Sequence, residues 1–347
     1  MATNVKFIGL LFIIILTSCK MEKEKKYRWI ATVSAPQEYP SEVYWGDLIA
    51  DDYHSSFSSI FGTSYAGWGN EGKSLGEGIQ VDIPHTLEFT YLSLVEKKFY
   101  TGKWQLDKAK ITALFDEGFM DYQINKRETF YSFIIGLAPK GRVALWVYAA
   151  GVQKEVGFFQ AHDTIITQKM AYENAQYMLN EGYPERTLQR AFGIEPAVKE
   201  KIAKYGRPDP NVYSDLYRER YSWKPVVLLP DGGVWKSSTI HLLNGELETL
   251  EGNELLKNDF QTRAIPFYFV AFWKSKTAES YAVRTDPFDE QEIINAFKKL
   301  GNKENIELIF KVAPNNESCR IFVKNKIEEI ELKKAIITCE GPFEFKI

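Results

Sequence analysis

The stretch "IPHTLEFTYLSLVEKKFYTGKWQLDKAKITALF", residues 83–115, decides the fold, because a diverged form of it recurs later in the chain. It aligns without a gap to "IPFYFVAFWKSKTAESYAVRTDPFDEQEIINAF", residues 265–297. The identical residues include Pro84 and Pro266, Ser93 and Ser275, Asp107 and Asp289, Ile111 and Ile293, and Phe115 and Phe297. Self-similarity of this kind predicts that a supersecondary unit is repeated.

Two shorter blocks repeat in the same order along the chain. "YRWIATVSAP", residues 27–36, is similar to "YSWKPVVLLP", residues 221–230. "FIIGLAP", residues 133–139, is similar to "LIFKVAP", residues 308–314. Three blocks in one order predict two diverged copies of one domain.

The residue pattern inside each copy predicts an α+β arrangement. Leu87, Phe89 and Tyr91 alternate with other residues, as in a half-buried strand. Asp107 can cap a helix whose apolar stripe contains Ile111 and Phe115. The continuous apolar run in residues 130–137 predicts a central strand covered on both faces. Each copy is therefore expected to be a mainly antiparallel sheet with one packed helix.

The corresponding helix of the second copy and the segment between the copies are also predicted to be helical. Asp286 and Pro287 are the expected cap and first helical residue of the second-copy helix. Segments 163–182, 183–193 and 195–206 carry apolar stripes, and the last two begin near a proline and end at a glycine. We expect a first domain at residues 27–160, a helical connector at 161–220 and a second repeat domain at 221–347.

The N-terminus resembles a bacterial lipoprotein signal. The apolar run "FIGLLFIIIL", residues 7–16, is shorter than the roughly 20 residues that span a bilayer core. Leu16, Thr17, Ser18 and Cys19 then match the lipobox that lipoprotein signal peptidase accepts. We expect residues 1–18 to be removed, Cys19 to be acylated and residues 19–26 to form a charged tether. This places the protein in the cell envelope, most simply at the outer membrane, with the leaflet left open.

Net charge and cysteine content indicate which partners and which covalent cross-links to expect. A net charge of −3 does not fit a nucleic-acid-binding protein, which needs a basic surface. Besides Cys19, only Cys319 and Cys339 are present, in an exported chain where disulfides form. If their strand-like runs are antiparallel neighbours, a disulfide closes the hairpin; otherwise they are two buried thiols that never meet.

The remaining motifs favour no cofactor. "GWGNEGKS", residues 67–74, satisfies the Walker A pattern, but no buried strand precedes it and no helical pattern follows it, so we expect no nucleotide. The four histidines are scattered, which predicts no metal site. Four aromatic residues bracket this glycine loop and are candidate contacts for a ligand or protein partner, although core packing is the other reading: Tyr44, Trp45, Tyr65 and Trp68.

Several motifs of the chain resemble those of a family of bacterial lipoproteins called domain of unknown function 2931. The resemblance is carried by residues 29–43, by "GWG", by "SLVEKKFY" with Ser93, Glu96 and Tyr100, and by "GLAPKGRVALW" up to Trp146. The resemblance adds Glu96 to the candidate contacts and implies that an anchored member neutralises a secreted antibacterial toxin. In the gapless alignment Glu96 and Tyr100 fall on Ala278 and Ala282, so we expect no site at those positions of the second copy.

Three functions follow from these observations. The first is a non-catalytic, membrane-tethered binding module with a protein partner in the envelope, for which an immunity-type protein is the example. The second is an envelope enzyme acting on glycan or lipid, which needs two converging carboxylates from Glu42, Asp47, Glu71 or Glu96. The third is a structural subunit of an outer-membrane assembly, which an exposed apolar face would support.

The anchor is tested by the Cys19→Ala substitution in the full chain. Without the thiol no acyl chain is attached, and each buried methylene that is lost removes about 0.8 kcal/mol of membrane affinity. We expect the variant in the soluble fraction and the wild type in the membrane fraction after cell lysis. A variant that stays with the membranes would contradict acylation at Cys19.

Overall fold

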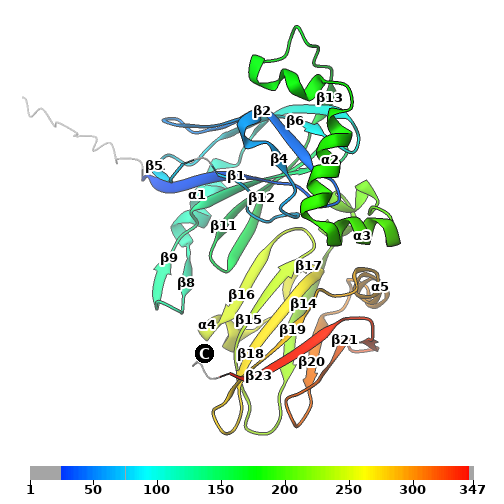
Figure 1. Cartoon of the computed structure of the whole chain (residues 1–347). Coiled ribbons are helices and arrows are strands. Elements are labelled where there is room, and N and C mark those ends of the chain that lie inside the picture. Colours follow the sequence, from blue (N-terminus) through cyan, green and yellow to red (C-terminus); the bar gives the residue numbers. More distant parts are fainter. Residues whose placement is uncertain (1–24, 75, 344–347) are drawn as a thin grey trace, which may run out of the picture.

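The computed structural model describes residues 25–74 and 76–343. Cys19, the expected signal peptide and most of the expected tether lie outside the described residues. The chain is an α+β protein built mainly from antiparallel strands. Figure 1 shows two halves, with the strands before residue 165 in the upper half and those after residue 219 in the lower half. Within the described residues, no helix is long and apolar enough to cross a membrane.

Among the described residues, the first half has two large sheets, a separate two-stranded hairpin and one helix. One sheet has the order β5 (Ile79–Val81), β1 (Tyr27–Ser34), β10 (Ser132–Ala138), β11 (Arg142–Ala149), β12 (Val152–Gln160). The other has the order β3 (His54–Ser58), β2 (Ser41–Ile49), β6 (Thr86–Ser93), β7 (Lys98–Gln105), β13 (His162–Thr164), with β4 (Thr63–Ser64) beside β2. Only β1 and β10 pair in parallel. The helix is α1 (Lys108–Glu117).

Each of the two sheets in the second half repeats the strand order of a sheet in the first half. One sheet is β17 (Gln261–Ala264), β14 (Arg220–Leu228), β20 (Ile306–Val312), β21 (Cys319–Lys324), β22 (Glu329–Leu332). The other is β16 (Leu247–Glu251), β15 (Val234–Leu242), β18 (Pro266–Lys274), β19 (Ser280–Thr285), β23 (Ile337–Phe343). Again only one pair, β14 with β20, is parallel. The helices are α4 (Gly252–Lys257) and α5 (Glu290–Leu300).

The expectation of one sheet per half is therefore wrong, because each half contains two sheets packed against each other. Strands such as β6 and β10 are apolar enough to be buried along almost their whole length, so a single sheet and one helix cannot cover them. In the first half, one core takes residues from both sheets and from α1, including Leu87, Phe133 and Phe115. The two sheets cover each other's apolar faces in each half.

A short contact joins the sheets of the two halves into one layer. Gln153 on β12 pairs with Leu247 on β16, so ten strands run continuously from β5 to β23. A second contact comes from the hairpin of β8 (Phe119–Asp121) and β9 (Lys126–Glu128), which extends toward α4 in Figure 1. There the backbone N–H of Asn253 donates to the Tyr122 hydroxyl at 3.1 Å.

The connector contains less α-helix than its sequence predicts. Its first segment forms β13 and a 3₁₀ turn, η2 (Glu173–Leu179), in place of one long helix. The next two segments are helices as expected, α2 (Tyr183–Ile194) and α3 (Pro196–Tyr205). Two further 3₁₀ turns, η3 (Pro210–Tyr213) and η4 (Leu216–Arg218), lead into β14.

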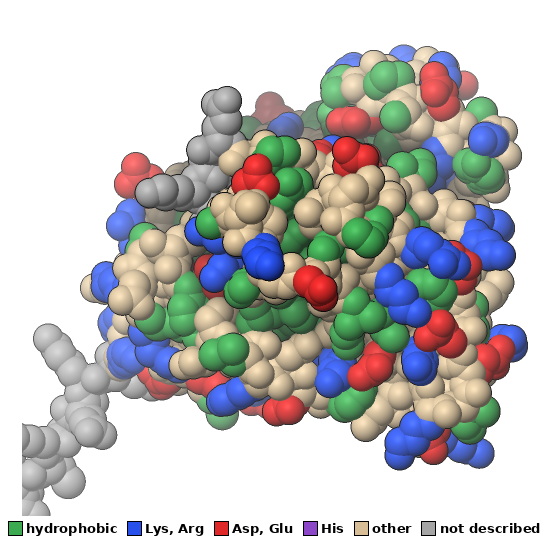
Figure 2. All heavy atoms as spheres, turned by 90° about the horizontal axis from the view of Figure 1, so that it is seen from below, with side chains coloured by type: hydrophobic (Ala, Val, Ile, Leu, Met, Phe, Trp, Pro, Cys, Tyr) green, Lys and Arg blue, Asp and Glu red, His purple; other side chains and the backbone are tan. Residues whose placement is uncertain are grey.

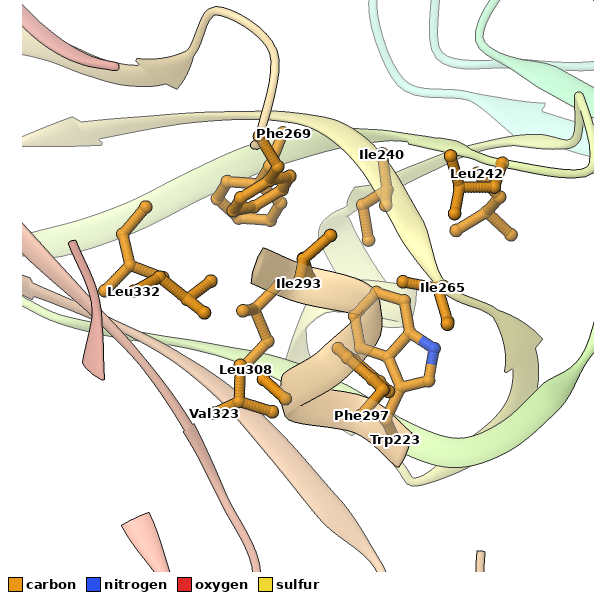
Figure 3. Packing of buried hydrophobic residues seen from close by; sticks show 14 of the residues in the cluster. Trp223, Ile240, Leu242, Ile265, Phe269, Ile293, Phe297, Leu308, Val323 and Leu332 are labelled. Carbon is orange, nitrogen blue, oxygen red and sulfur yellow. The ribbon is translucent and has the colours of Figure 1, made fainter. Parts of the chain in front are cut away.

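A buried tryptophan occupies the same place in each half. The Trp29 indole N–H donates to the carbonyl of Asp82 at 3.0 Å, and that of Trp223 donates to Ala264 at 3.0 Å. Both side chains are at most 1% exposed. Figure 3 shows Trp223 beside Phe297 of α5, with residues of both sheets around them.

A tyrosine and a phenylalanine also pack alike in the two halves. Tyr27 meets Phe115 edge-on at 5.3 Å between ring centroids and 72° between planes. Tyr221 meets Phe297 edge-on at 5.4 Å and 72°. In both halves the aromatic ring on the helix is held against the first strand of its sheet, which fixes where the helix lies.

The helix caps match, with one correction. The Asp107 carboxylate accepts from the backbone N–H of Lys110 at 2.9 Å, and Asp289 accepts from Glu292 at 2.9 Å. The second helix therefore starts after Asp289, and the expectation of a cap at Asp286 is wrong. A carboxylate at this position satisfies a backbone donor that the helix itself leaves free.

The surface has no region of a single charge on the face that Figure 2 shows. Lysine, arginine, aspartate and glutamate side chains are interspersed there, and hydrophobic side chains gather near the middle. This mixture agrees with the net charge of −3.

The role of the helix ring in the core is tested by Phe297→Ala. The side chain is fully buried, so we expect the free energy of unfolding to fall by about 3–5 kcal/mol, measured by urea denaturation. The control is Leu256→Ala, because Leu256 is 84% exposed and its removal should cost less than about 0.5 kcal/mol. Equal stability of the two variants would contradict this packing.

Candidate functional site

A cavity of about 440 Å³ lies between the two halves among the described residues. The first half contributes residues 36–38, the glycine loop at 67–71, and Tyr148 and Gln153 from β11 and β12. The second half contributes the β15–β16 hairpin at 241–247, Phe267 of β18 and Glu290 of α5. The connector closes the side with Lys201, Pro208, Tyr213 and Tyr217.

A tight contact between two glycine turns holds one wall of the cavity. Gly69 has a φ of +80°, and a Cβ there would lie 2.7 Å from the Cα of Gly245, so neither turn has room for a side chain. Gln153 is 3% exposed, and its Nε2 donates to the carbonyls of Gly69 at 2.7 Å and Gly245 at 2.5 Å. One amide thus joins the glycine loop, the β15–β16 hairpin and the ten-stranded sheet.

Behind this wall, aromatic rings meet edge-on in a continuous group that we call the ring stack. Trp68 meets Trp146 edge-on at 4.8 Å and Tyr213 at 5.3 Å. Tyr213 in turn meets Tyr217 at 5.4 Å. The Trp146 indole N–H donates to the carbonyl of Asn244 at 3.2 Å, which ties the stack to the second half. Such stacks are rigid and present both apolar faces and polar edges to a ligand.

Carboxylates face the same cavity from four segments, with Glu71 on the glycine loop as one of them. Glu290 accepts from the Tyr217 hydroxyl at 2.8 Å, and burial raises the pKa of its carboxyl. Glu38 pairs with Lys201 at 2.7 Å. Glu246 pairs with Arg220 at 3.0 Å. The pKa of His241 is lowered by burial, so its ring is neutral at pH 7.

The four aromatic candidates from the sequence lie in three different places. Trp68 lines the cavity. Tyr44 is 7% exposed and stacks on Tyr172 at 5.3 Å, with its hydroxyl accepting from the Tyr172 backbone N–H at 3.1 Å. Trp45 packs against the same cluster beneath the connector. Tyr65 lines a smaller cavity of about 230 Å³.

Glu96 holds a turn in place. Its carboxylate accepts from the Ser93 hydroxyl at 2.8 Å, from the Tyr100 hydroxyl at 3.3 Å and from the Lys140 backbone N–H at 3.0 and 3.1 Å. These contacts fix residues 139–141, and Lys140 Nζ then donates to Asn211 of the connector at 3.0 Å.

The second half has a similar group of contacts, contrary to the gapless alignment. Tyr91 pairs with Tyr100 across β6 and β7, whereas Trp273 pairs with Tyr281 across β18 and β19. The second hairpin is therefore one residue shorter, and Tyr281 takes the place of Tyr100. Glu279 accepts from the hydroxyls of Ser275 at 3.5 Å and Tyr281 at 3.3 Å. Glu279 and Tyr281 thus take these places, each one position away from the alanines that the gapless alignment assigns.

The carboxylates named for an enzyme do not share one site. Glu42 is 2% exposed and accepts from the hydroxyls of Thr63 and Tyr177, under the connector. Asp47 lies on β2, 3.9 Å from His54. Only Glu71 of the four lines the large cavity. The sequence did not single out Glu38, Tyr217 and Glu290, because no local motif marks residues that meet only when the halves pack together.

The expected disulfide is not formed: Cys319 and Cys339 are free thiols. Their strands are not neighbours, because β21 pairs with β20 and β22 in one sheet while β23 pairs with β19 in the other. Burial raises the pKa of the Cys319 thiol to about 12 and that of Cys339 to about 11, so both stay protonated at neutral pH.

The family is established by its sequence model. The family described as "Protein of unknown function (DUF2931)" matches residues 17–208, more than half of the chain, and the chain belongs to this family. The match covers the first half and the connector as far as Pro208, and thus every cavity segment up to that residue. Comparison with curated proteins and with solved structures gives no match.

Proposed function

We propose that the protein is a lipid-anchored, non-catalytic binding module of the bacterial cell envelope, with its ligand or partner entering the cavity between two diverged copies of one domain. The observation that carries the proposal is the cavity itself. Its volume of about 440 Å³ lies within the roughly 300–1,000 Å³ that is usual for ligand pockets. Its wall combines rigid aromatic rings with a few polar groups, as such pockets do.

Paired contacts support the duplication. The strand orders of the two halves match sheet by sheet, and each half has a single parallel pair at the same place among the described strands. The tryptophan hydrogen bonds to residues 82 and 264 repeat at the offset of the long sequence block. The aromatic pairs and the aspartate caps repeat as well. A pair of copies provides a natural origin for a site at their junction.

The lipobox at Cys19 and the charged residues after it support the envelope location. An acylated N-terminus would hold the cavity within a tether's length of the bilayer. A toxin delivered to the envelope is the kind of partner that an immunity-type protein would meet there, and partner capture needs no catalytic group.

One observation favours an enzyme as the second candidate. Glu38 and Glu290 both line the cavity, and the charge of Glu38 contributes to the raised pKa of Glu290. Two carboxyl groups whose surroundings push their pKa values apart are the arrangement that glycoside hydrolysis uses. Here, however, Glu38 is paired with Lys201 and Glu290 is held by Tyr217. Glycan turnover that Glu290→Gln removes would favour this candidate.

The binding function is tested by photo-crosslinking in cells that produce the full, anchored chain. Phe267 lines the cavity and is 42% exposed, so benzoylphenylalanine in its place should trap the occupant of the cavity. Phe260 is 36% exposed, lies outside the cavity and is the matched control. We expect a discrete adduct from position 267 and none from position 260.

Two results would count against the proposal. The first is no adduct from position 267 in a chain that is folded and membrane-bound. The second is the same set of adducts from both positions, which would mean that the cavity attracts nothing that the rest of the surface does not.

A further inference from the structure

The charges around the cavity are unbalanced. Among the described residues that line it, four are glutamates and one is a lysine, namely Glu38, Glu71, Glu246, Glu290 and Lys201. Lys201 forms an ion pair with Glu38, and Glu246 forms an ion pair with Arg220, which does not line the cavity. Within the described residues, neither Glu71 nor Glu290 forms an ion pair. Lys201 also acts electrostatically on Glu290, but it is paired with Glu38, so among the described residues neither carboxylate has an ion-pair partner of its own.

The two unpaired carboxylates differ in their surroundings. Glu71 is exposed on the glycine loop. Glu290 is half-buried at the start of α5, with one hydroxyl donor from Tyr217. Burial raises the pKa of Glu290, which means that its negative charge is poorly solvated. A positive group bound nearby would replace the missing solvation and stabilise that charge.

The aromatic rings suit the same kind of group. Trp68, Tyr148, Tyr217 and Phe267 line the cavity together with these carboxylates. A cation within about 6 Å of an aromatic ring is attracted by roughly 0.5–2 kcal/mol. Ring faces and carboxylates together are how proteins recognise alkylammonium and guanidinium groups.

A metal ion fits this cavity less well than an organic cation. Within the described residues, no group of three histidine, cysteine, aspartate or glutamate side chains is placed to hold a metal. A hard cation such as Ca²⁺ needs six to eight oxygen ligands. The cavity is also far larger than an ion and is walled by apolar rings.

We propose that the occupant of this cavity carries an organic cation, an arginine or lysine side chain of a partner protein, which binds between the ring stack and the carboxylates of Glu71 and Glu290. This inference rests on the proposed binding function and specifies the chemistry of the group that enters. The partner therefore presents a basic side chain on a protruding segment.

The test compares two probes of equal shape with the detergent-solubilised full chain. The probes are acetyl-Gly-Arg-Gly-amide and the same peptide with citrulline, which is neutral and nearly isosteric with arginine. Saturation-transfer NMR titration gives the affinity of each. We expect the arginine peptide to bind at least about tenfold more tightly, the difference between a charged and a neutral hydrogen-bonded partner.

The carboxylates are tested by Glu71→Gln and Glu290→Gln, with Glu117→Gln on the exposed surface of α1 as the control for total charge. Each cavity variant should weaken the arginine peptide by about three- to tenfold and leave the citrulline peptide unchanged. Glu71 lies in an exposed loop, so its variant remains informative even if Glu290→Gln disturbs the start of α5.

The outcomes distinguish failure of the preference for a cation from failure of the proposed binding function. If both peptides bind alike and Phe267→Ala weakens both, the cavity binds ligands but the preference for a cation is overturned. If neither peptide binds while position 267 still crosslinks in cells, the proposal of a cationic occupant is again overturned, and the proposed binding function stands. If neither binds and position 267 gives no adduct, both fail.

Discussion

The side-chain amide of Gln153 is the interaction on which the cavity depends. It lies where β12 meets β16, is almost fully buried, and donates to one carbonyl from each half. Among the described residues, one residue pair joins the two sheets at this point, so the backbone alone gives the junction little strength. Without the amide, the carbonyls of Gly69 and Gly245 would be buried with one partner fewer, which is costly in an interior. The glycine loop and the β15–β16 hairpin would then lose the two hydrogen bonds that join them through one side chain.

The chemistry of the site follows from that junction. Because the halves meet at two glycine turns, their backbones approach closely on one side and leave a space on the other. The first half lines this space with Trp68 and Glu71, and the second with Phe267 and Glu290. Neither half forms the cavity by itself. A ligand in the cavity would therefore contact both halves at once.

Local patterns were enough to predict the elements and not enough to predict the site. The alternation at residues 87–91 and the stripe of Ile111 and Phe115 each depend on neighbours in sequence, and both elements are present. Tyr44 and Trp45 have the composition of a binding surface, yet the connector covers them, which only the packing reveals. The cysteine strands looked like a hairpin because they are close in sequence, whereas topology puts them in different sheets. Glu38 and Glu290 come from opposite ends of the chain, and no periodicity connects them.

Hydrogen–deuterium exchange on Gln153→Leu tests the central claim most directly, because leucine keeps the volume but removes both donated hydrogen bonds. The account predicts that exchange accelerates together in residues 67–71 and 242–247, while β20 and β21 in the core of the second half stay protected. Unchanged exchange in both segments, or acceleration in only one of them, would show that the halves are not held together through this amide.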